Sequence, residues 1–172
     1  MNVSAKQFFQ ANFVDHILAA IRQHAINPAL LKLELTESIL IKNIEDTIAT
    51  MNALGEMGIQ FSLDDFGVGY SSLQYLKKLP LNQLKIDQSF IRDIAEDSDD
   101  QAIVRTIIAM AKSLDLDAIA EGVESEPQRQ FLLSYGCSNY QGYLFGKPVS
   151  ISQFEASLRQ GRLGSGTGWL SF

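Results

Sequence analysis

The sequence predicts an α/β fold in which helices cover a parallel β-sheet. About six segments alternate apolar with polar residues, as strands do, and a helical repeat or a short helical turn follows each. Parallel neighbours need such crossovers, so the sheet is either doubly wound or closed as a barrel. Two observations favour the barrel. No Gly-x-Gly-x-x-Gly motif follows the first strand, and acidic residues recur at the ends of four strands, where the active residues of (β/α) barrels collect.

The first elements are the end of a strand and an amphipathic helix. Residues 1–4 predict a strand that runs into a helix, since Ser4 and Gln7 have the spacing of a capping box. The helix stops before Asn27-Pro28, and one stripe of its surface is apolar and faces a core. That stripe consists of Phe9, Phe13, Ile17 and Ile21, with Val14 and Leu18 beside it.

Two strands and the helix between them follow. Residues 31–37 alternate apolar with polar side chains and predict a strand whose faces have different environments. Apolar residues from Ile44 to Leu54 repeat at helical spacing, and Gly58 ends that helix before a strand at Ile59–Asp64. This strand ends in the adjacent acids Asp64-Asp65 and a glycine-rich turn, a pattern typical of a buried strand that opens onto an active-site loop.

A short helix, a strand and a long helix come next. Apolar residues from Leu73 to Leu79 repeat at helical spacing, and this helix must end at the following proline. Residues 84–87 alternate again and predict a strand in which Lys85 points the same way as the closing aspartate. Ser98 starts a long helix whose broad apolar stripe extends from Ile103 to Leu114.

The last third of the chain repeats the order of strand, acid and glycine. Residues 118–124 predict such a strand, and residues 125–128 place a cap and a proline at the start of a helix that stops at Gly136. A short strand and turn at residues 139–143 precede a last helix, which Ser152 caps.

The elements and the composition predict a single domain. The chain has 172 residues, of which 46% are hydrophobic, enough to build one sizeable core. We place the domain at residues 1–160 and a glycine- and serine-rich tail at residues 161–172.

Charge and cysteine content limit the partners and the location. Lys and Arg number 14 and Asp and Glu number 20, and the net charge of -6 argues against a nucleic acid polymer as partner. A small anionic ligand could still bind through metal ions. Cys137 is the only cysteine, so no intrachain disulfide forms and a reducing compartment fits best. No apolar run approaches the roughly 20 residues of a membrane span, and we expect a cytoplasmic protein without one.

Polar residues at the predicted strand ends form a candidate site. All but one are acids or amides, whose oxygens suit Mg²⁺ or Mn²⁺ better than zinc. The two histidines, His16 and His24, fall on a predicted helix away from the strand ends. If the strand ends converge, the acids can hold two cations about 4 Å apart, which suits displacement at a phosphodiester, and the lysine adds positive charge near the reacting oxygens. The residues are Asn2, Glu34, Asp64, Asp65, Lys85, Glu121 and Gln141.

Each of these residues also has a simpler interpretation. Asp64-Asp65 matches a surface turn, and Glu34 matches a solvent-facing strand residue. Lys85 could extend to solvent from a strand edge. Glu121-Gly122 and Gln141-Gly142 match ordinary turns, and Asn2, at the start of the sequence, matches a disordered terminus. The prediction therefore depends on the whole arrangement.

The segments around these residues resemble a known family. They are Asn2-Val3-Ser4, Glu34-Leu35-Thr36-Glu37, the loop from Asp64 to Ser72, Leu84-Lys85-Ile86-Asp87, Glu121-Gly122-Val123-Glu124 and Gln141-Gly142-Tyr143-Leu144-Phe145-Gly146-Lys147-Pro148. In this order they closely resemble successive motifs of the EAL domain family, from residue 2 to about residue 158. The resemblance implies a modified TIM (β/α) barrel, cyclic di-GMP as ligand, and its hydrolysis to linear pGpG with Mg²⁺ or Mn²⁺.

The resemblance also implies roles for single residues. The residues that look like metal ligands are Asn2, Glu34, Asp64, Asp65 and Glu121. The residues that resemble the family's catalytic groups, facing the water and the phosphate, are Lys85, Glu121 and Gln141. Glu124 and Gln141 look like substrate-binding residues, and Glu37 looks like the residue that anchors the loop from Asp64 to Ser72.

The sequence departs from the family pattern at its start. The family is named for a Glu-Ala-Leu motif on the first barrel strand, whose glutamate is a metal ligand, and this sequence begins after it. Its only Glu-Ala pair, Glu155-Ala156, is followed by Ser157. The resemblance therefore implies an incomplete barrel with open strand edges. A second copy, a missing segment, or the tail with Trp169 could cover the gap, and we expect a homodimer or association with a missing segment.

Three functions are compatible with these features. The first is a metal-dependent phosphodiesterase domain, the second a module that binds cyclic di-GMP without turnover, and the third a partial domain that pairs with another chain. The first has every implied ligand except the glutamate of the Glu-Ala-Leu motif, while the other two follow from its absence in this sequence.

Overall fold

The structure is a computed structural model that describes residues 1–41, 43–69 and 73–159. In this part of the chain six parallel strands form one sheet in the order β1-β2-β3-β4-β5-β6, so strands that follow each other in sequence lie side by side. The predicted parallel α/β sheet is confirmed. The tail predicted at residues 161–172 lies outside the described residues. The strands are β1 (Asn2–Val3), β2 (Lys32–Thr36), β3 (Gln60–Phe66), β4 (Gln83–Ile86), β5 (Asp117–Glu121) and β6 (Asn139–Gln141).

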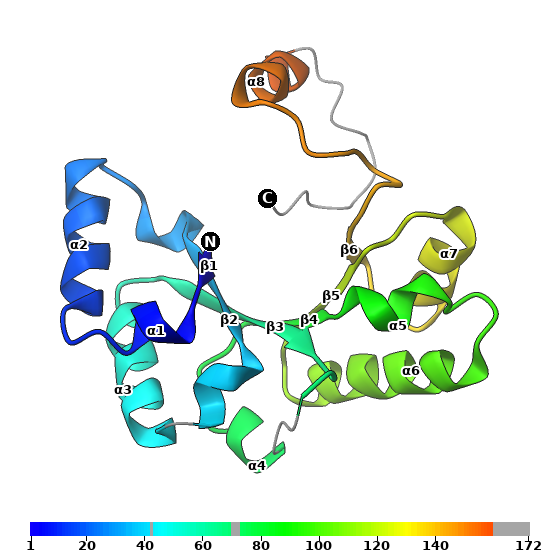
Figure 1. Cartoon of the computed structure of the whole chain (residues 1–172), viewed down its shortest axis with the longest axis horizontal. Coiled ribbons are helices and arrows are strands. Elements are labelled where there is room, and N and C mark those ends of the chain that lie inside the picture. The colour runs from blue at the N-terminus through cyan, green and yellow to red at the C-terminus, as the bar shows by residue number, and fades with distance from the viewer. Residues whose placement is uncertain (42, 70–72, 160–172) are drawn as a thin grey trace.

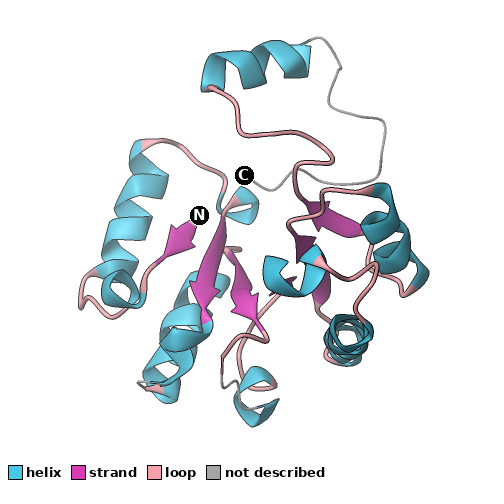
Figure 2. Ribbon diagram, turned by 45° about the vertical axis from the view of Figure 1, so that its right-hand side comes forward, coloured by secondary structure: helices cyan, strands magenta, loops and turns pink. Residues whose placement is uncertain are grey.

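Helices surround the outer side of the curved sheet, and α8 lies apart from it (Figures 1 and 2). The α-helices are α1 (Ala5–Phe8), α2 (Phe13–Gln23), α3 (Ile44–Gly55), α4 (Leu73–Leu76), α5 (Gln88–Arg92), α6 (Ser98–Ser113), α7 (Glu126–Ser134) and α8 (Ile151–Arg159). Two 3₁₀ helices are η1 (Pro28–Leu30) and η2 (Glu37–Ile41). None of the helices within the described ranges is long and apolar enough to cross a membrane.

One face of the sheet is apolar and the other is polar, because side chains alternate along each strand. The apolar side chains pack with those of the helices in the core, among them Leu33, Leu35, Phe61, Leu63, Leu84 and Ile86, none more than 2% exposed. The register pairs Glu34 with Ser62 and Glu121 with Gln141, so polar residues of neighbouring strands share the opposite face. That polar face positions the candidate site.

The predicted first helix is two helices. Residues 9–12 separate α1 from α2, and Asn12 precedes α2 as its N-cap residue. The break brings the rings of Phe8 and Phe13 to a centroid separation of 5.3 Å, and both are buried. A helical stripe that ran on through Phe9 would have placed Phe8 on a different face, so burial of two large rings outweighs helix continuity here.

The structure also differs from the sequence prediction at α5 and at the start of α8. Asp87 is the N-cap of α5, which the sequence did not predict, and its side chain accepts a hydrogen bond from the Ser89 N–H at 2.9 Å. The last helix starts at Ile151, because Ser150 rather than Ser152 faces Gln153, whose Oε1 accepts from the Ser150 N–H at 3.2 Å. A serine two residues upstream thus forms the cap.

Candidate active site

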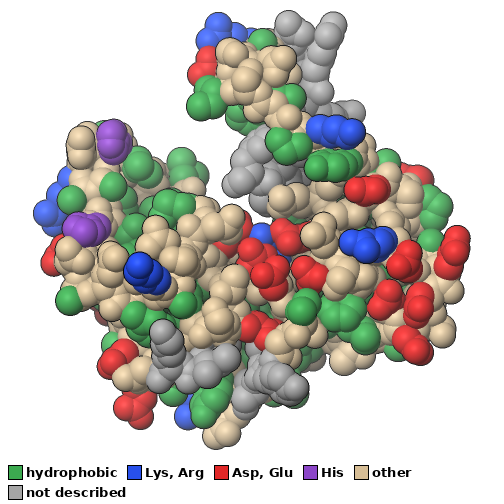
Figure 3. Space-filling view, viewed as in Figure 1, with side chains coloured by type: hydrophobic (Ala, Val, Ile, Leu, Met, Phe, Trp, Pro, Cys, Tyr) green, Lys and Arg blue, Asp and Glu red, His purple; other side chains and the backbone are tan. Residues whose placement is uncertain are grey.

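Four strands bring charged side chains together at their carboxyl ends. Lys85 Nζ on β4 lies 2.8 Å from Glu34 Oε2 on β2, 2.9 Å from Asp64 Oδ1 on β3 and 2.6 Å from Glu121 Oε1 on β5. Acidic side chains gather at the centre of the molecular face in Figure 3. The structure therefore joins residues that lie far apart in the sequence, as the strand-end prediction required.

Lys85 is a buried ammonium held by three carboxylates. It is 4% exposed, and burial alone would lower its pKa. Hydrogen bonds to Glu121, Glu34 and Asp64 outweigh that effect, so the pKa of Lys85 is raised and the side chain stays charged. The sequence alternative of a lysine that extends to solvent is wrong, because carboxylates of neighbouring strands on the polar face of the sheet supply its counterions.

Three acids form a group that could hold a metal ion. Oxygens of Asp64, Asp65 and Glu121 all lie within 4.8 Å of one another. The β3–β4 pairing shifts register between Leu63 and Phe66, which changes the direction of the side chains in this part of β3. Asp65 lies there and has a left-handed φ of 55°. Such a backbone is costly for a residue other than glycine, and it persists where the surrounding structure holds it.

The site carries more negative than positive charge. Burial, then Asp64 and Asp87, raise the pKa of Asp65, and burial raises the pKa of Glu121 although Lys85 opposes it. Four acids, Glu34, Asp64, Asp65 and Glu121, therefore face one ammonium. Oxygen donors with uncompensated negative charge are what a hard divalent cation binds, so the residues present fit such an ion.

Asp87 is a site residue that the sequence prediction did not include. It raises the pKa of Asp65 through its charge and a side-chain hydrogen bond. The sequence signal was present, since an acid follows Lys85 by two residues. The sequence pattern predicts Asp87 only as the end of a strand. The position of Asp87 beside Asp65 depends on α5, which the sequence did not predict.

The remaining predicted residues surround this group. Asn2 pairs with Glu34 in the β1–β2 register, and Gln141 pairs with Glu121 in the β5–β6 register. Asn2 and Gln141 therefore lie directly across from Glu34 and Glu121 on the neighbouring strands. Glu124 is exposed in the connection after β5, where its backbone N–H donates to Gln128 Oε1 at 2.8 Å.

Glu37 lies against the loop that follows β3. It is 8% exposed, and its Oε1 accepts a hydrogen bond from the Gly67 N–H at 3.1 Å. A side chain at Gly69 would collide with Glu37 Oε2, so the loop passes close to this carboxylate only because residue 69 is a glycine. Among the described residues, Oε2 has no hydrogen-bond partner.

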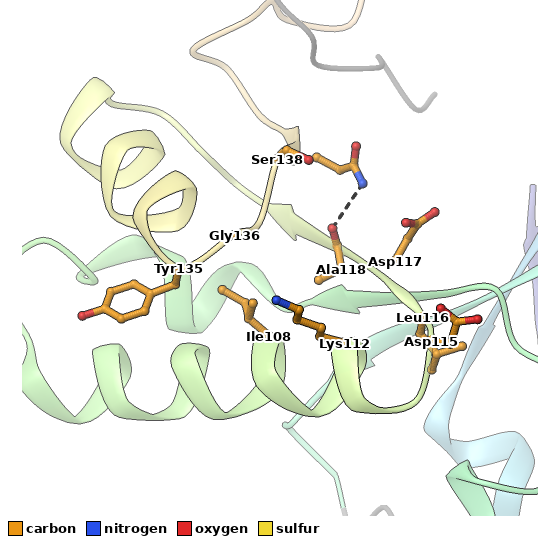
Figure 4. A pocket seen from close by; sticks show the side chains of 10 residues that line it. Ile108, Lys112, Asp115, Leu116, Asp117, Ala118, Tyr135, Gly136 and Ser138 are labelled. Atoms are coloured by element: carbon orange, nitrogen blue, oxygen red, sulfur yellow. Dashed lines mark hydrogen bonds between the residues drawn. The ribbon is translucent and has the colours of Figure 1, made fainter.

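A hollow of about 310 Å³ opens at the other end of β5 and β6 (Figure 4). Residues of its wall include Lys112, Asp115, Asp117 and Tyr135, and Asn139 Nδ2 donates to the Ala118 carbonyl at 3.5 Å. None of the predicted site residues lines this hollow. The chemistry-bearing side chains therefore lie at the opposite, carboxyl ends of the strands.

Comparison with known proteins gives the chain a family. The EAL domain family matches residues 1–148. The bifunctional diguanylate cyclase/cyclic di-GMP phosphodiesterase MucR of Pseudomonas aeruginosa is 46% identical over 158 residues, which are 92% of this chain and 23% of MucR. The chain thus spans about a quarter of the length of this relative.

Solved structures agree with the sequence match. The PaMucR phosphodiesterase in complex with c-di-GMP superposes with a TM-score of 0.85 at 46% identity, over 89% of this chain and 62% of that one. The EAL domain of Mycobacterium smegmatis DcpA gives 0.88 at 39% identity, over 93% and 72%. Klebsiella pneumoniae BlrP1, solved with manganese and cyclic di-GMP, gives 0.78 at 28% identity, over 86% and 38%. This chain belongs to the EAL domain family.

Proposed function

We propose that this chain carries a cyclic di-GMP phosphodiesterase site that hydrolyses its ligand to linear pGpG with Mg²⁺ or Mn²⁺. The observation that supports the proposal most is the buried Lys85 with its three carboxylates, next to the acidic group of Asp64, Asp65 and Glu121. A lysine and several acids at the carboxyl ends of parallel strands suit positioning and charge stabilisation at a phosphodiester.

The proposed metal ligands are the strand-end oxygens. When bound, divalent cations would supply Lewis-acid activation of water and stabilisation of charge on the phosphoryl oxygens. Asp64 and Glu121 belong to the acidic group and also lie beside Lys85, so both would contribute oxygens to the proposed cation site. The ligands we propose are Asn2, Glu34, Asp64, Asp65 and Glu121.

The other proposed roles belong to groups that face the ligand. Lys85 stays charged and would stabilise negative charge that develops on the phosphoryl oxygens. Gln141 lies beside Glu121 and would orient the phosphate through its amide. Glu124, exposed in the connection after β5, would hold the substrate. Glu37 would keep the loop after β3 in place.

One feature favours a second candidate, a module that binds cyclic di-GMP without turnover. The sequence contains no Glu-Ala-Leu, so the 172-residue chain by itself lacks the ligand that this motif provides in the family. The purified chain with cyclic di-GMP and Mn²⁺ separates the candidates. Linear product supports the phosphodiesterase, and calorimetric binding without product supports the module. If the chain shows neither product nor binding, both candidates are contradicted.

Replacing Glu37 by alanine should disturb the loop after β3 without removing a metal ligand. The Gly67 N–H loses its acceptor, so residues 64–69 should exchange amide hydrogens about tenfold faster, while Mn²⁺ affinity changes less than in a ligand variant. Hydrogen exchange and calorimetry measure both. Glu56→Ala, an exposed acid after α3, is the control. Loss of Mn²⁺ binding with unchanged loop exchange would make Glu37 a ligand instead.

Mn²⁺ binding should weaken as the pH falls from neutrality, before the ordinary carboxyl range is reached. Protons compete with the ion for carboxylate oxygens, and the raised pKa of Asp65 and Glu121 starts this competition at a higher pH. The raised pKa of Lys85 keeps its charge constant throughout. Calorimetry at about pH 7.5 and about pH 5.5 should show at least a tenfold loss of affinity. Equal affinities would exclude these acids from the site.

We also propose that the 172-residue chain self-associates, most simply as a two-fold dimer. In the described sheet β1 and β6 are the two edges, and an open edge offers unpaired backbone groups. Exposed apolar side chains lie beyond β6, including Tyr143 at 56% and Ile151 at 78%. A second copy that covers the edges and this apolar surface would pair the backbone groups and remove the apolar side chains from water.

Sedimentation at micromolar concentration should show a species larger than the 19.1 kDa monomer. Ile151→Lys should weaken the association, because it places a charge on α8. Ile103→Lys, at an exposed apolar residue of α6, which packs on β4 and β5 rather than at a sheet edge, is the control and should not. A folded, cooperative monomer would contradict this proposal.

A cytoplasmic location is also part of the proposal. Cys137 is a free thiol that is 1% exposed, and burial raises its pKa to about 11. A thiol kept neutral in the core suits a reducing compartment.

A further inference from the structure

Gln128 is a buried side chain that joins two connections of the fold. Its Oε1 accepts hydrogen bonds from the backbone N–H groups of Glu124 at 2.8 Å and Ser125 at 2.9 Å. Its Nε2 donates to the carbonyls of Ile91 at 3.1 Å and Arg92 at 3.0 Å. The residue is 7% exposed, and these four bonds satisfy the amide group on both sides.

The two connections that Gln128 joins carry the candidate site. The first begins at Glu121, the last residue of β5, and continues to Glu124. The second is α5, whose last turn contains Ile91 and Arg92 and whose N-cap Asp87 lies two residues beyond Lys85. One amide therefore fixes the distance between the segment that follows Glu121 and the segment that follows Lys85.

The hydrogen bonds exceed what helix capping requires. The capping box at the start of α7 pairs the Ser125 side chain with the Gln128 N–H and the Gln128 side chain with the Ser125 N–H. Of the four bonds that the Gln128 side chain makes, the box therefore uses only the one from the Ser125 N–H. The bonds to α5 serve another purpose, because a helix of five residues has little stability of its own. The β5–α7 connection and α5 also approach each other closely at Gly122 and Gln88. Gly122 has a φ of +71°, and a Cβ there would lie 2.7 Å from Gln88 Cβ.

We infer that Gln128 is a positioning residue of the site proposed above, on which this inference rests. It fastens the β5–α7 connection to α5, so that Glu121 and Glu124 keep a fixed relation to Lys85 and Asp87 when ligand binds. The two connections then move as one unit, and binding does not have to order them separately.

Amide hydrogen exchange and calorimetry on three variants test this inference. Gln128→Met removes all four hydrogen bonds at similar volume. Gln128→Glu keeps the acceptors for Glu124 and Ser125 but loses both donors to α5. Gln101→Met is the matched control, because Gln101 Nε2 also donates to a backbone carbonyl after α5, that of Ile94 at 3.0 Å.

In Gln128→Met the amides of Glu124 and Ser125 should exchange about tenfold faster, and cyclic di-GMP with Mn²⁺ should bind about tenfold more weakly. In Gln128→Glu those two amides should stay protected while the amides of α5 exchange faster. Gln101→Met should change neither the exchange of these amides nor ligand affinity by more than about twofold.

Two results would overturn the inference. One is unchanged exchange at Glu124 and Ser125 in Gln128→Met, and the other is faster exchange with ligand affinity unchanged. If Gln128→Met does not fold, Gln128→Glu provides the test. Faster exchange of the α5 amides with weaker ligand binding supports the inference, and unchanged exchange or unchanged affinity overturns it. If the unsubstituted chain binds no cyclic di-GMP, the proposed function fails, and the exchange pattern alone supports or overturns the link between the two connections.

Discussion

Replacing Lys85 by methionine should destabilise the metal-free chain by about 3 kcal/mol, because three partly buried carboxylates lose their shared counterion. Their side chains are 12%, 15% and 18% exposed, so some solvation remains and the lower part of the expected range applies. Urea unfolding at neutral pH measures this change. The exposed lysine of α6 gives the control Lys112→Met, which should change stability by less than about 0.5 kcal/mol.

The destabilisation should depend on pH and on metal. Burial raises the pKa of Glu121 and Lys85 opposes that shift, so loss of Lys85 should raise the folded-state pKa of Glu121 further above its unfolded value. Stability of Lys85→Met should therefore rise as the pH falls from 7 towards about 5. Mn²⁺ should stabilise this variant more than the unsubstituted chain, since the ion replaces the missing charge. Unchanged stability at neutral pH would mean that the ion pairs of Lys85 are not what holds the acids together.

Replacing Asp64 by asparagine should lower Mn²⁺ affinity by on the order of 100-fold, the largest effect on binding that we expect from one substitution. Asp64 belongs to the acidic group and also faces Lys85, so the change would remove a carboxylate oxygen from the proposed cation site. Glu34→Gln should affect binding less, because Glu34 contacts Lys85 and lies outside that group.

Calorimetric titration with Mn²⁺ measures the effect of Asp64→Asn. Asp117→Asn, at an exposed acid of the hollow at the other end of the sheet, is the control and should bind Mn²⁺ like the unsubstituted chain. Equal titrations for Asp64→Asn and the unsubstituted chain would remove Asp64 from the site.

The sheet and most of the strand-end residues were predictable because both depend on local patterns. Alternation at residues 31–37 and 59–64 places Glu34 and Asp64 on the face opposite to the core residues Leu33 and Leu63, as the structure shows. Parallel order then brings carboxyl ends of neighbouring strands to one edge.

Features that depend on contacts between distant segments were not predictable. Asp87 acts on Asp65 only because α5 begins there, and a five-residue helix has too short a pattern to detect. The break after α1 depends on the packing of Phe8 against Phe13. The link from Gln128 to Ile91 spans 37 residues, and the sequence suggests only its cap to Ser125.

A crystal structure of this chain with Mn²⁺ and cyclic di-GMP, with anomalous scattering to locate the ions, tests the central claim most directly. We expect Mn²⁺ bound to oxygens of Asp64, Asp65 and Glu121, and a ligand phosphate within reach of Lys85. Ions bound elsewhere, such as at Asp115 and Asp117 of the hollow at the other end of the sheet, would contradict the proposed site. A phosphate remote from Lys85 would contradict it equally.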